Sequence, residues 1–330
     1  MTRSLPLVTI CVPTYNSSRY LRETLDSLVS QSYGNLEVII SDNASQDDSV
    51  EIAQEYGRRY GFRVLVNETN SGPFRNWNNL IAEARGEYLA LYHSDDVYGP
   101  DIVHKCVGLL EADPELGLVG TLATIVDENG AQLSATELPS GTAPDGRYRL
   151  ADAFRAVVRS GGSRYFLVTP SVMVRRRMYR ELGGFDTTGR FGSAGDYEMW
   201  LRIAAHAPVA VLPEYLMKYR VHSAQGSEQE LRRNVALPDI LEVLAAHAPA
   251  IQAGELLDEY RRYRARAIFK TALKQNCRGE FERSRETAAL VGAGRYRVAA
   301  LGLMAASLVR VNLALWPGRP WPCRIAREKA

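Results

Sequence analysis

The sequence predicts an α/β fold in which one mixed, mainly parallel, Rossmann-like sheet is flanked by helices and followed by a helical C-terminal extension. Short apolar segments alternate with segments of helical periodicity over the first half of the chain. Each of these apolar segments ends in polar turn residues. The segment 88–92 (YLALY) is apolar throughout, which is typical of a strand buried on both faces of a parallel sheet.

The first hundred residues contain the clearest alternation. The predicted strands are 7–12, 36–40, 62–66 and 88–92, and the predicted helices are 18–30, 48–60 and 74–84. Strands separated by helices of this length pair in parallel through right-handed crossovers. The carboxyl ends of these strands are therefore expected at one edge of the sheet.

The second half of the chain continues the sheet and then becomes helical. We expect strands at 117–126 and 165–174, a helix at 152–159 and a Ser-, Thr-, Pro- and Gly-rich surface loop at 134–148. After residue 228 the pattern is helical. We therefore expect one domain at 1–228, divided near residue 100, and a helical extension at 229–330.

Composition excludes several classes of protein. The formal net charge is +2 over 330 residues, so no nucleic-acid partner is indicated. The four cysteines contain no CxxC pair, so a zinc knuckle is not indicated. The short apolar run at the N-terminus lacks a small-residue cleavage site and leads into the turn 13–16, so we interpret it as a strand and expect a cytoplasmic protein. No apolar run reaches the roughly 20 residues of a membrane-spanning helix.

Two adjacent carboxylates follow the buried strand, in Ser94-Asp95-Asp96. Ligands of open α/β sheets collect at the carboxyl ends of strands. Carboxylate oxygens at such a position suit Mg²⁺ or Mn²⁺, and these ions also take phosphate oxygens of a substrate. An acid-rich helix start without a metal is the alternative.

Polar residues at the other strand ends suit a nucleotide. Asp42 can accept hydrogen bonds from a base or ribose, Tyr15 can flank the base, and backbone amides can face phosphate oxygens. Ordinary turn chemistry explains Asp42 equally well. The first strand is followed by PTYNSS, which is neither G-x-G-x-x-G nor a P-loop, so a nicotinamide or flavin site of that type is not indicated.

Three segments resemble a known family. They read VTICVPTYN, LEVIISDNASQDDS and NSGPFRNWNNLIAEARGEYLALYHSDD, in this order within the first hundred residues. They are similar to the nucleotide-binding half of family 2 glycosyltransferases, which have the glycosyltransferase A fold and use nucleotide-diphosphate sugars. The resemblance implies that residues 1–100 bind the nucleotide-sugar and that residues 101–228 form the acceptor half of a catalytic domain.

The same resemblance implies a set of donor contacts. Pro13, Tyr15 and Asp42 are expected round the nucleotide, with Asp42 facing the base. The full expected set for donor binding is Pro13, Thr14, Tyr15, Asp42, Asn70, Gly72, Asn76, Ser94, Asp95 and Arg220.

The resemblance also implies a metal site. Asp95 and Asp96 match the end of the family's acidic motif, and His222 in YRVHSAQGS is a candidate third ligand or diphosphate contact. Arg220 in the same segment is a candidate diphosphate partner. Family members often carry Asp where this chain has His93, which is either a weaker ligand or a strand-end residue.

The segment 183–204 is expected to supply the catalytic base. It reads GDYEMWLR from Gly195 to Arg202, where the family has an acidic pair before an aromatic residue. The first acid of that pair is Gly195 in this chain, and the second, Asp196, matches the presumed catalytic base. Glu198 is the second candidate, and a helix cap is the structural alternative for Asp196.

Two further features allow two interpretations each. Arg175, Arg176 and Arg177 suggest contacts with phosphate or an anionic acceptor, or a solvated helix start. The segment 298–309 is uncharged and mostly apolar, with Arg310 and two tryptophans after it. It suits a helix lying on a membrane surface, or a helix packed on the catalytic core or on a second subunit of a homodimer.

Together these interpretations predict a metal-dependent, inverting glycosyltransferase that uses Mn²⁺ or Mg²⁺. It moves a sugar from a nucleotide-diphospho-sugar to a hydroxyl of a glycan, lipid-linked glycan or small molecule, in bacterial cell-surface polysaccharide or glycolipid synthesis. A nucleotidyltransferase is one alternative, although such enzymes should show a Gly-rich basic loop after the first strand. A non-catalytic nucleotide-sugar-binding protein is the other, because His93 and Gly195 replace acids.

Overall fold

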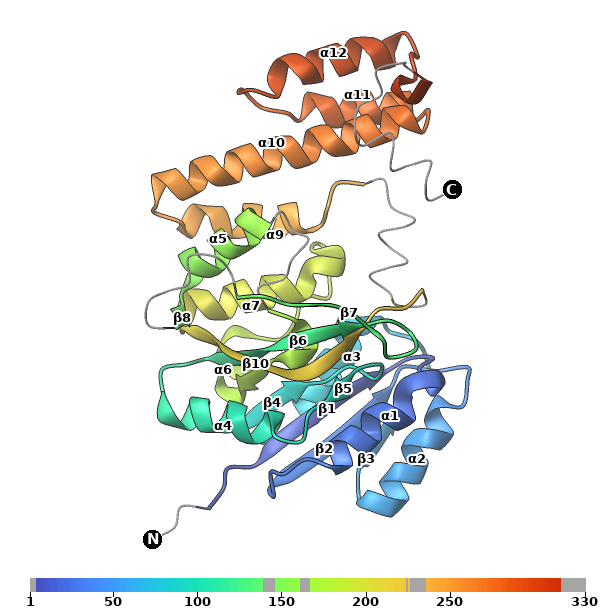
Figure 1. The fold of residues 1–330 in the computed structure, drawn as a ribbon, viewed down its shortest axis with the longest axis vertical. Coiled ribbons are helices and arrows are strands. Elements are labelled where there is room, and N and C mark those ends of the chain that lie inside the picture. Colours follow the sequence, from blue (N-terminus) through green and yellow to red (C-terminus); the bar gives the residue numbers. More distant parts are fainter. Residues whose placement is uncertain (1–3, 139–145, 161–166, 224, 226–235, 316–330) are drawn as a thin grey trace. The chain divides into compact units, whose positions relative to one another are not determined.

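The computed structural model describes residues 4–138, 146–160, 167–223, 225 and 236–315. The chain forms two compact units, residues 1–228 and residues 229–330 (Figure 1). Residues 139–145 of the predicted loop 134–148, and Trp316 and Trp321, lie outside the described residues.

Four parallel strands form one half of the sheet in the first unit. They are β1 (Val8–Thr14), β2 (Leu36–Asp42), β3 (Arg63–Val66) and β4 (Tyr88–Leu91), joined by the helices α1 (Ser18–Val29), α2 (Ser49–Tyr60) and α3 (Pro73–Glu83). β1 pairs in parallel with β2 and β4, and β2 pairs in parallel with β3. The predicted alternation of strands and helices is therefore confirmed.

The other half of the sheet contains strands of both directions. They are β5 (Val97–Tyr98), β6 (Leu118–Val126), β7 (Gln132–Ala135), β8 (Arg147–Tyr148), β9 (Met173–Arg175) and β10 (Val209–Arg220). The order across the sheet is β3-β2-β1-β4-β9-β6-β10-β5, with β7 on β6 and β8 on β10. β9 is antiparallel to both β4 and β6, and β10 is parallel to β6. β6 and β10 therefore run in the same direction as β4, so β10 ends at the same edge of the sheet as β1, β2 and β4.

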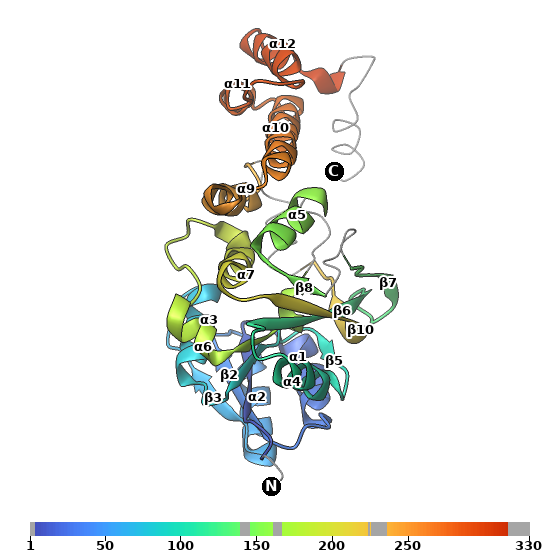
Figure 2. The same ribbon diagram turned by 90° about the vertical axis from the view of Figure 1, so that its left-hand side faces the viewer.

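Helices cover both faces of this sheet (Figure 2). α1, α2 and α4 (Ile102–Ala112) share one apolar core with the sheet. α3, α6 (Arg176–Leu182) and α7 (Gly195–His206) lie on the opposite face, and α5 (Leu150–Ser160) packs against α7. In β1, Val8, Ile10 and Val12 enter the core under α1, whereas Cys11 lies near Tyr179 of α6. Burial on both faces explains why β4 is apolar throughout.

The predicted strand 165–174 is wrong in its first part. Residues 165 and 166 lie outside the described residues, and the next described residues form the 3-10 turn η1 (Thr169–Ser171) before the short strand β9. Pro170 has no N–H to donate to a strand ladder, so it favours the turn over a continuous strand. As a result Thr169 leaves the sheet and becomes available to α7.

The second unit is helical. It contains α9 (Ile240–His247), η3 (Ala248–Ala250), α10 (Gly254–Cys277), α11 (Phe281–Ala289), α12 (Arg297–Leu308) and η4 (Leu313–Leu315). α10, α11 and α12 pack round their own apolar cluster. The buried side chain of Asn276 donates to Ser307 Oγ and to the Val311 carbonyl, both at 3.0 Å, which ties the end of α12 to α10. Among the described helices, none combines the length and the apolar character needed to cross a membrane.

Arg175, the last residue of the antiparallel strand β9, stabilises the position of this strand in the sheet. Its side chain is almost fully buried. Nε–H donates to the Leu116 carbonyl (2.7 Å), one Nη donates to the Tyr88 hydroxyl (3.0 Å), and the other donates to the carbonyls of Leu110 and Asp113. A planar guanidinium can serve several acceptors at once in this way.

The two arginines that follow also bond to the backbone. Arg176 donates to the Ala84 carbonyl (3.3 Å), and Arg177 donates to the Pro114 carbonyl (3.0 Å). Contacts with an anionic ligand are therefore not needed to explain this run of arginines, which stabilises the fold.

We expect Arg175→Lys to lower the free energy of unfolding by about 2–4 kcal/mol, because one ammonium group leaves several buried carbonyls unpaired. Urea unfolding followed by circular dichroism measures this change. The matched control is Arg177→Lys, an exposed position, for which we expect a change within about 0.5 kcal/mol. Equal unfolding midpoints for the two variants contradict the structural role of Arg175.

Candidate functional site

Three possible metal ligands follow β4. The ligand atoms of His93, Asp95 and Asp96 all lie within 4.8 Å of one another. Asp96 is 0% exposed, and neither its Oδ2 nor Nε2 of His93 has a hydrogen-bond partner among the described residues. A buried polar atom without a partner is costly unless a ligand binds it. Carboxylate oxygens and an imidazole nitrogen are donors that a divalent cation accepts, so these residues fit such an ion.

The electrostatics of this group also favour a cation. Burial raises the pKa of Asp96 well above its ordinary value, and the neighbouring charge of Asp95 raises it further. Burial lowers the pKa of His93, so its neutral form is favoured. A cation beside Asp96 would favour the ionised form of its carboxylate.

The end of β10 holds the acidic pair in place. The backbone N–H of Arg220 donates to Asp96 Oδ1 (2.8 Å), its Nε–H donates to the Asp95 carbonyl (2.9 Å), and His222 Nε2 lies 3.0 Å from Asp95 Oδ2. This contact exists because β5, which directly follows the acids, pairs with β10. His222 thus reaches Asp95, but it is His93 that completes the group of three.

The Arg220 side chain, expected to contact a diphosphate, is engaged by other residues of the chain. It is 3% exposed. Its guanidinium donates to the Glu23 carboxylate (2.6 Å) and lies 4.7 Å from the centroid of the Tyr20 ring. The described contacts indicate that Arg220 positions Asp95 and Asp96.

Asp42 ends β2 with its carboxylate fully buried. It accepts the backbone N–H of Ser45 (2.8 Å) and the Ser45 hydroxyl (2.5 Å), and Ser45 Oγ accepts the N–H of Asn16 (2.8 Å). Ala44 and Asn16 have φ values of 65° and 48°, a conformation that occurs often at ligand sites. In this conformation Asp42 stabilises the turn, so contact with a base requires the turn at Ala44 to move.

The turn after β1 presents groups of different exposure at the same edge. Tyr15 is exposed, Pro13 is half-buried, and Thr14 is buried with an Oγ1 that has no hydrogen-bond partner among the described residues. The hydroxyls of Ser17 and Ser94 are 2.7 Å apart. The ends of β1 and β4 are therefore brought together.

Side-chain amides attach the loop before α3 to the end of β2. Asn43 Nδ2 donates to Asn70 Oδ1 (2.9 Å) and to the Gly72 carbonyl (3.3 Å). Buried Asn76 donates to the Ser41 carbonyl (3.0 Å) and accepts the Ser41 hydroxyl (2.6 Å). Gly72 has a φ of 84° that favours glycine. Asn76 therefore stabilises the loop, whereas exposed Asn70 is accessible at the edge.

Asp196 lies in the first turn of α7 and accepts two hydrogen bonds. Its Oδ2 accepts the Thr169 hydroxyl (2.5 Å), and its Oδ1 accepts the N–H of Tyr197 (2.7 Å). Trp200 Nε1–H donates to Thr169 Oγ1 (3.2 Å). Because an indole N–H can only donate, the Thr169 hydroxyl accepts from Trp200 and gives its own proton to Asp196.

These contacts set the basicity of Asp196. Burial raises its pKa above the ordinary value, and the hydrogen bonds from Thr169 and Tyr197 limit that rise. A carboxylate with a raised pKa takes a proton more readily. Glu198, the second candidate, is buried and paired with Arg202 at 2.8 Å. Its contact is structural, so the geometry favours Asp196.

Aromatic contacts connect the acidic group to α7. The ring of Trp77 lies 5.5 Å from that of His93 and 5.1 Å from that of Phe74, measured between centroids. A Cβ atom at Gly195 would lie 2.6 Å from the Phe74 ring. Phe74 stands at the N-terminal end of α3, at the carboxyl edge of the sheet, so Asp196 lies at the same edge as the acidic group.

Residues 9–183 match the family model described as glycosyl transferase family 2, which is more than half of the chain. The chain belongs to this family. The resemblance noted from the sequence is thereby confirmed. Asp196, Arg220 and His222 lie beyond the matched residues of this family 2 chain.

A Bacillus subtilis (strain 168) protein, EpsE, is 32% identical over 199 residues, which are 60% of this chain and 66% of EpsE. The match thus spans just under two thirds of the relative's length.

Solved structures of low identity share the fold. TarS of S. aureus (residues 1–349, with UDP) has a TM-score of 0.61 and 18% identity, covering 98% of this chain and 92% of TarS. The mannosyltransferase PcManGT of Pyrobaculum calidifontis, with GDP-Man and Mn²⁺, has a TM-score of 0.59 and 19% identity, covering 98% of this chain and 83% of PcManGT. The expected glycosyltransferase A fold is confirmed.

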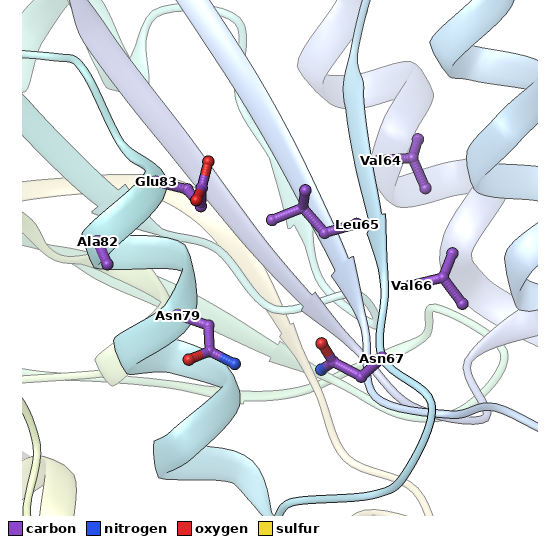
Figure 3. A pocket seen from close by; sticks show the side chains of 7 residues that line it. All are labelled: Val64, Leu65, Val66, Asn67, Asn79, Ala82 and Glu83. Carbon is purple, nitrogen blue, oxygen red and sulfur yellow. The ribbon is translucent and has the colours of Figure 1, made fainter.

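A depression of about 500 Å³ elsewhere on this family 2 domain is not the candidate site. It lies between β3 and α3 (Figure 3), lined by Val64, Leu65, Val66, Asn67, Asn79, Ala82 and Glu83. Its lining residues do not include His93, Asp95 or Asp96, nor any residue of α7.

Sequence reasoning missed Thr169, Trp200 and Phe74. Thr169 falls within the strand expected at 165–174, and Trp200 stands in the segment GDYEMWLR without an expected role. The Thr-Pro pair at 169–170 was the available signal for a turn. No local signal pairs Phe74 with Gly195.

We expect Thr169→Val to raise the pKa of Asp196 further, because it removes a hydrogen bond to the charged form. The titration of the Asp196 carboxyl carbon by NMR measures this, with the signal assigned by its absence in Asp196→Asn. A pKa that is unchanged or lower in Thr169→Val shows that this hydroxyl does not control the carboxylate.

Proposed function

We propose that this family 2 chain is a metal-dependent, inverting glycosyltransferase that moves a sugar from a nucleotide-diphospho-sugar to a hydroxyl acceptor. The observation that carries the proposal is the shared sheet edge. An acidic group that fits a divalent cation and the half-buried carboxylate of Asp196, whose pKa is raised, both lie there.

The structural neighbours support the donor class. TarS has been solved with UDP and with UDP-GlcNAc, and PcManGT with GDP-Man and Mn²⁺. For this chain we propose the same class of donor. We propose that Pro13, Thr14, Tyr15, Asn70 and Ser94 contact this donor, while Asp42, Gly72, Asn76 and Arg220 shape the surrounding turns.

Asp95, Asp96 and His93 are proposed to hold Mn²⁺ or Mg²⁺, with His222 positioning Asp95 or joining as a ligand. When bound, a divalent cation neutralises charge on the departing nucleotide diphosphate. At the end of β10, Arg220 holds the Asp96 carboxylate through its backbone N–H and the Asp95 backbone carbonyl through its side chain.

Asp196 is proposed as the catalytic base. It accepts the proton of the acceptor hydroxyl as the acceptor oxygen attacks the anomeric carbon. The bond from that carbon to the diphosphate oxygen breaks, and its electron pair leaves with the nucleotide diphosphate. One direct displacement inverts the anomeric centre.

The proposal extends to the cell. We propose that the enzyme acts in the cytoplasm, at the inner face of the plasma membrane, in the synthesis of bacterial cell-surface polysaccharide or glycolipid. Its acceptor is a glycan, a lipid-linked glycan or a small molecule. The C-terminal helices are proposed to contact the membrane peripherally or, alternatively, to form a homodimer interface. The competing function is a non-catalytic nucleotide-sugar-binding protein, favoured by His93 and Gly195 in place of acids.

A transfer assay with UDP-, GDP- and dTDP-sugars and Mn²⁺ tests the proposed activity. Turnover with one donor class supports the transferase. Tight donor binding without turnover or hydrolysis favours the competing function. Transfer of a nucleotidyl group in place of a sugar would assign the chain to nucleotidyltransferases.

We expect Asp196→Asn to reduce turnover by about 10²–10⁴-fold, because the amide cannot accept the proton. Donor binding, measured by calorimetry, should be unchanged. Glu198→Gln is the matched variant, expected to lower stability through its lost pair with Arg202 while keeping turnover. The reverse result assigns the base to Glu198.

Removing one proposed ligand should weaken metal-dependent donor binding. We expect Asp95→Ala to raise the Kd for the donor at least about tenfold with Mn²⁺, and to make binding insensitive to EDTA. The control is Asp101→Ala, an exposed acid in the same segment, with wild-type affinity expected. Unchanged Mn²⁺ dependence in Asp95→Ala removes the metal assignment.

A further inference from the structure

Helix α12 has two apolar faces. Ala300, Leu303 and Ser307 are buried on the face toward the rest of the helical unit. On the opposite face Val298 and Leu308 are 79% and 64% exposed. Among the described residues, nothing covers this second face.

The exposed face is a continuous stripe. Its members recur at helical spacing, and they are Val298, Leu301, Gly302, Ala305, Leu308 and Val309. No charged residue occurs between Arg297 and Arg310. A helix that is apolar all round is normally buried, so this stripe indicates a binding partner.

The charge around the stripe identifies the kind of partner. From residue 287 to residue 327 the chain contains six arginines and no Asp or Glu. Exposed Arg295 and Arg297 lie at the N-terminal end of the stripe, and exposed Arg310 lies at its other end. Apolar side chains flanked by arginines suit the interface of a bilayer that carries negative headgroups.

A second copy of the chain fits this face less well. Pairing two α12 stripes in either orientation brings the terminal arginines of both copies together. The acid-free segment 287–327 offers no carboxylate to offset that repulsion. An anionic lipid surface satisfies the apolar stripe and the arginines at the same time.

We propose that the exposed stripe of α12 inserts into the surface of a bilayer that contains anionic lipid, with Arg295, Arg297 and Arg310 on the headgroups. This names the surface and the lipid class for the peripheral contact proposed above. It does not depend on sugar transfer, so either proposal can fail without the other.

Flotation of the full chain with vesicles tests this. We expect binding to phosphatidylcholine vesicles that contain phosphatidylglycerol, and at least about tenfold weaker binding to phosphatidylcholine alone. Leu301→Asp/Leu308→Asp should reduce binding to the anionic vesicles at least about tenfold, because charges on the stripe oppose insertion. Arg295→Gln/Arg310→Gln should weaken binding about fivefold for each arginine removed.

The matched control is Leu133→Asp/Leu138→Asp, which places two equal charges on exposed leucines of the first unit. It should bind as the wild type does. Thermal melting checks that all variants are folded. Absence of binding to anionic vesicles, or equal loss in the control pair, overturns the proposal. So does a dimer in sedimentation velocity that Leu301→Asp/Leu308→Asp converts to a monomer, since the stripe then belongs to a second copy.

Discussion

The hydrogen bond from the Arg220 backbone to the buried carboxylate of Asp96 is the contact on which the rest of the site depends. It joins residues more than a hundred positions apart, and it forms only because β5 pairs with the end of β10. The same arginine holds the Asp95 carbonyl and the Glu23 carboxylate. The pairing of two strands thus decides where the acidic oxygens point, and a shift in the register of β10 would misplace them together.

A second balance governs Asp196. Burial makes its ionised form costly, and donors from Thr169 and Tyr197 recover part of that cost. The single hydroxyl proton of Thr169 is committed by the indole of Trp200, which can only donate. Thr169 and Tyr197 therefore orient the Asp196 carboxylate, while burial keeps its pKa, and so its tendency to accept a proton, above the ordinary value.

Local patterns in the sequence predicted the parallel half of the sheet, because the alternation of apolar strands and helices can be recognised from neighbouring residues. They also located Asp95, Asp96 and Asp196 at element ends. They could not show contacts between residues far apart in the sequence, such as those of Glu23 and Tyr20 with Arg220. For Asp42 the sequence left a donor contact and turn chemistry open, and the structure adds a hydrogen bond from Ser45. The strand expected at 165–174 gave way to a turn at Pro170, and that turn supplies the partner of Asp196.

The contact between Gly195 and Phe74 couples these two positions. The ring occupies the volume that a side chain at 195 would need, so a larger residue fits at 195 only if the Phe74 ring turns away or residue 74 is smaller. Exchanging segments of this enzyme with those of relatives would meet the same barrier unless both positions travel together.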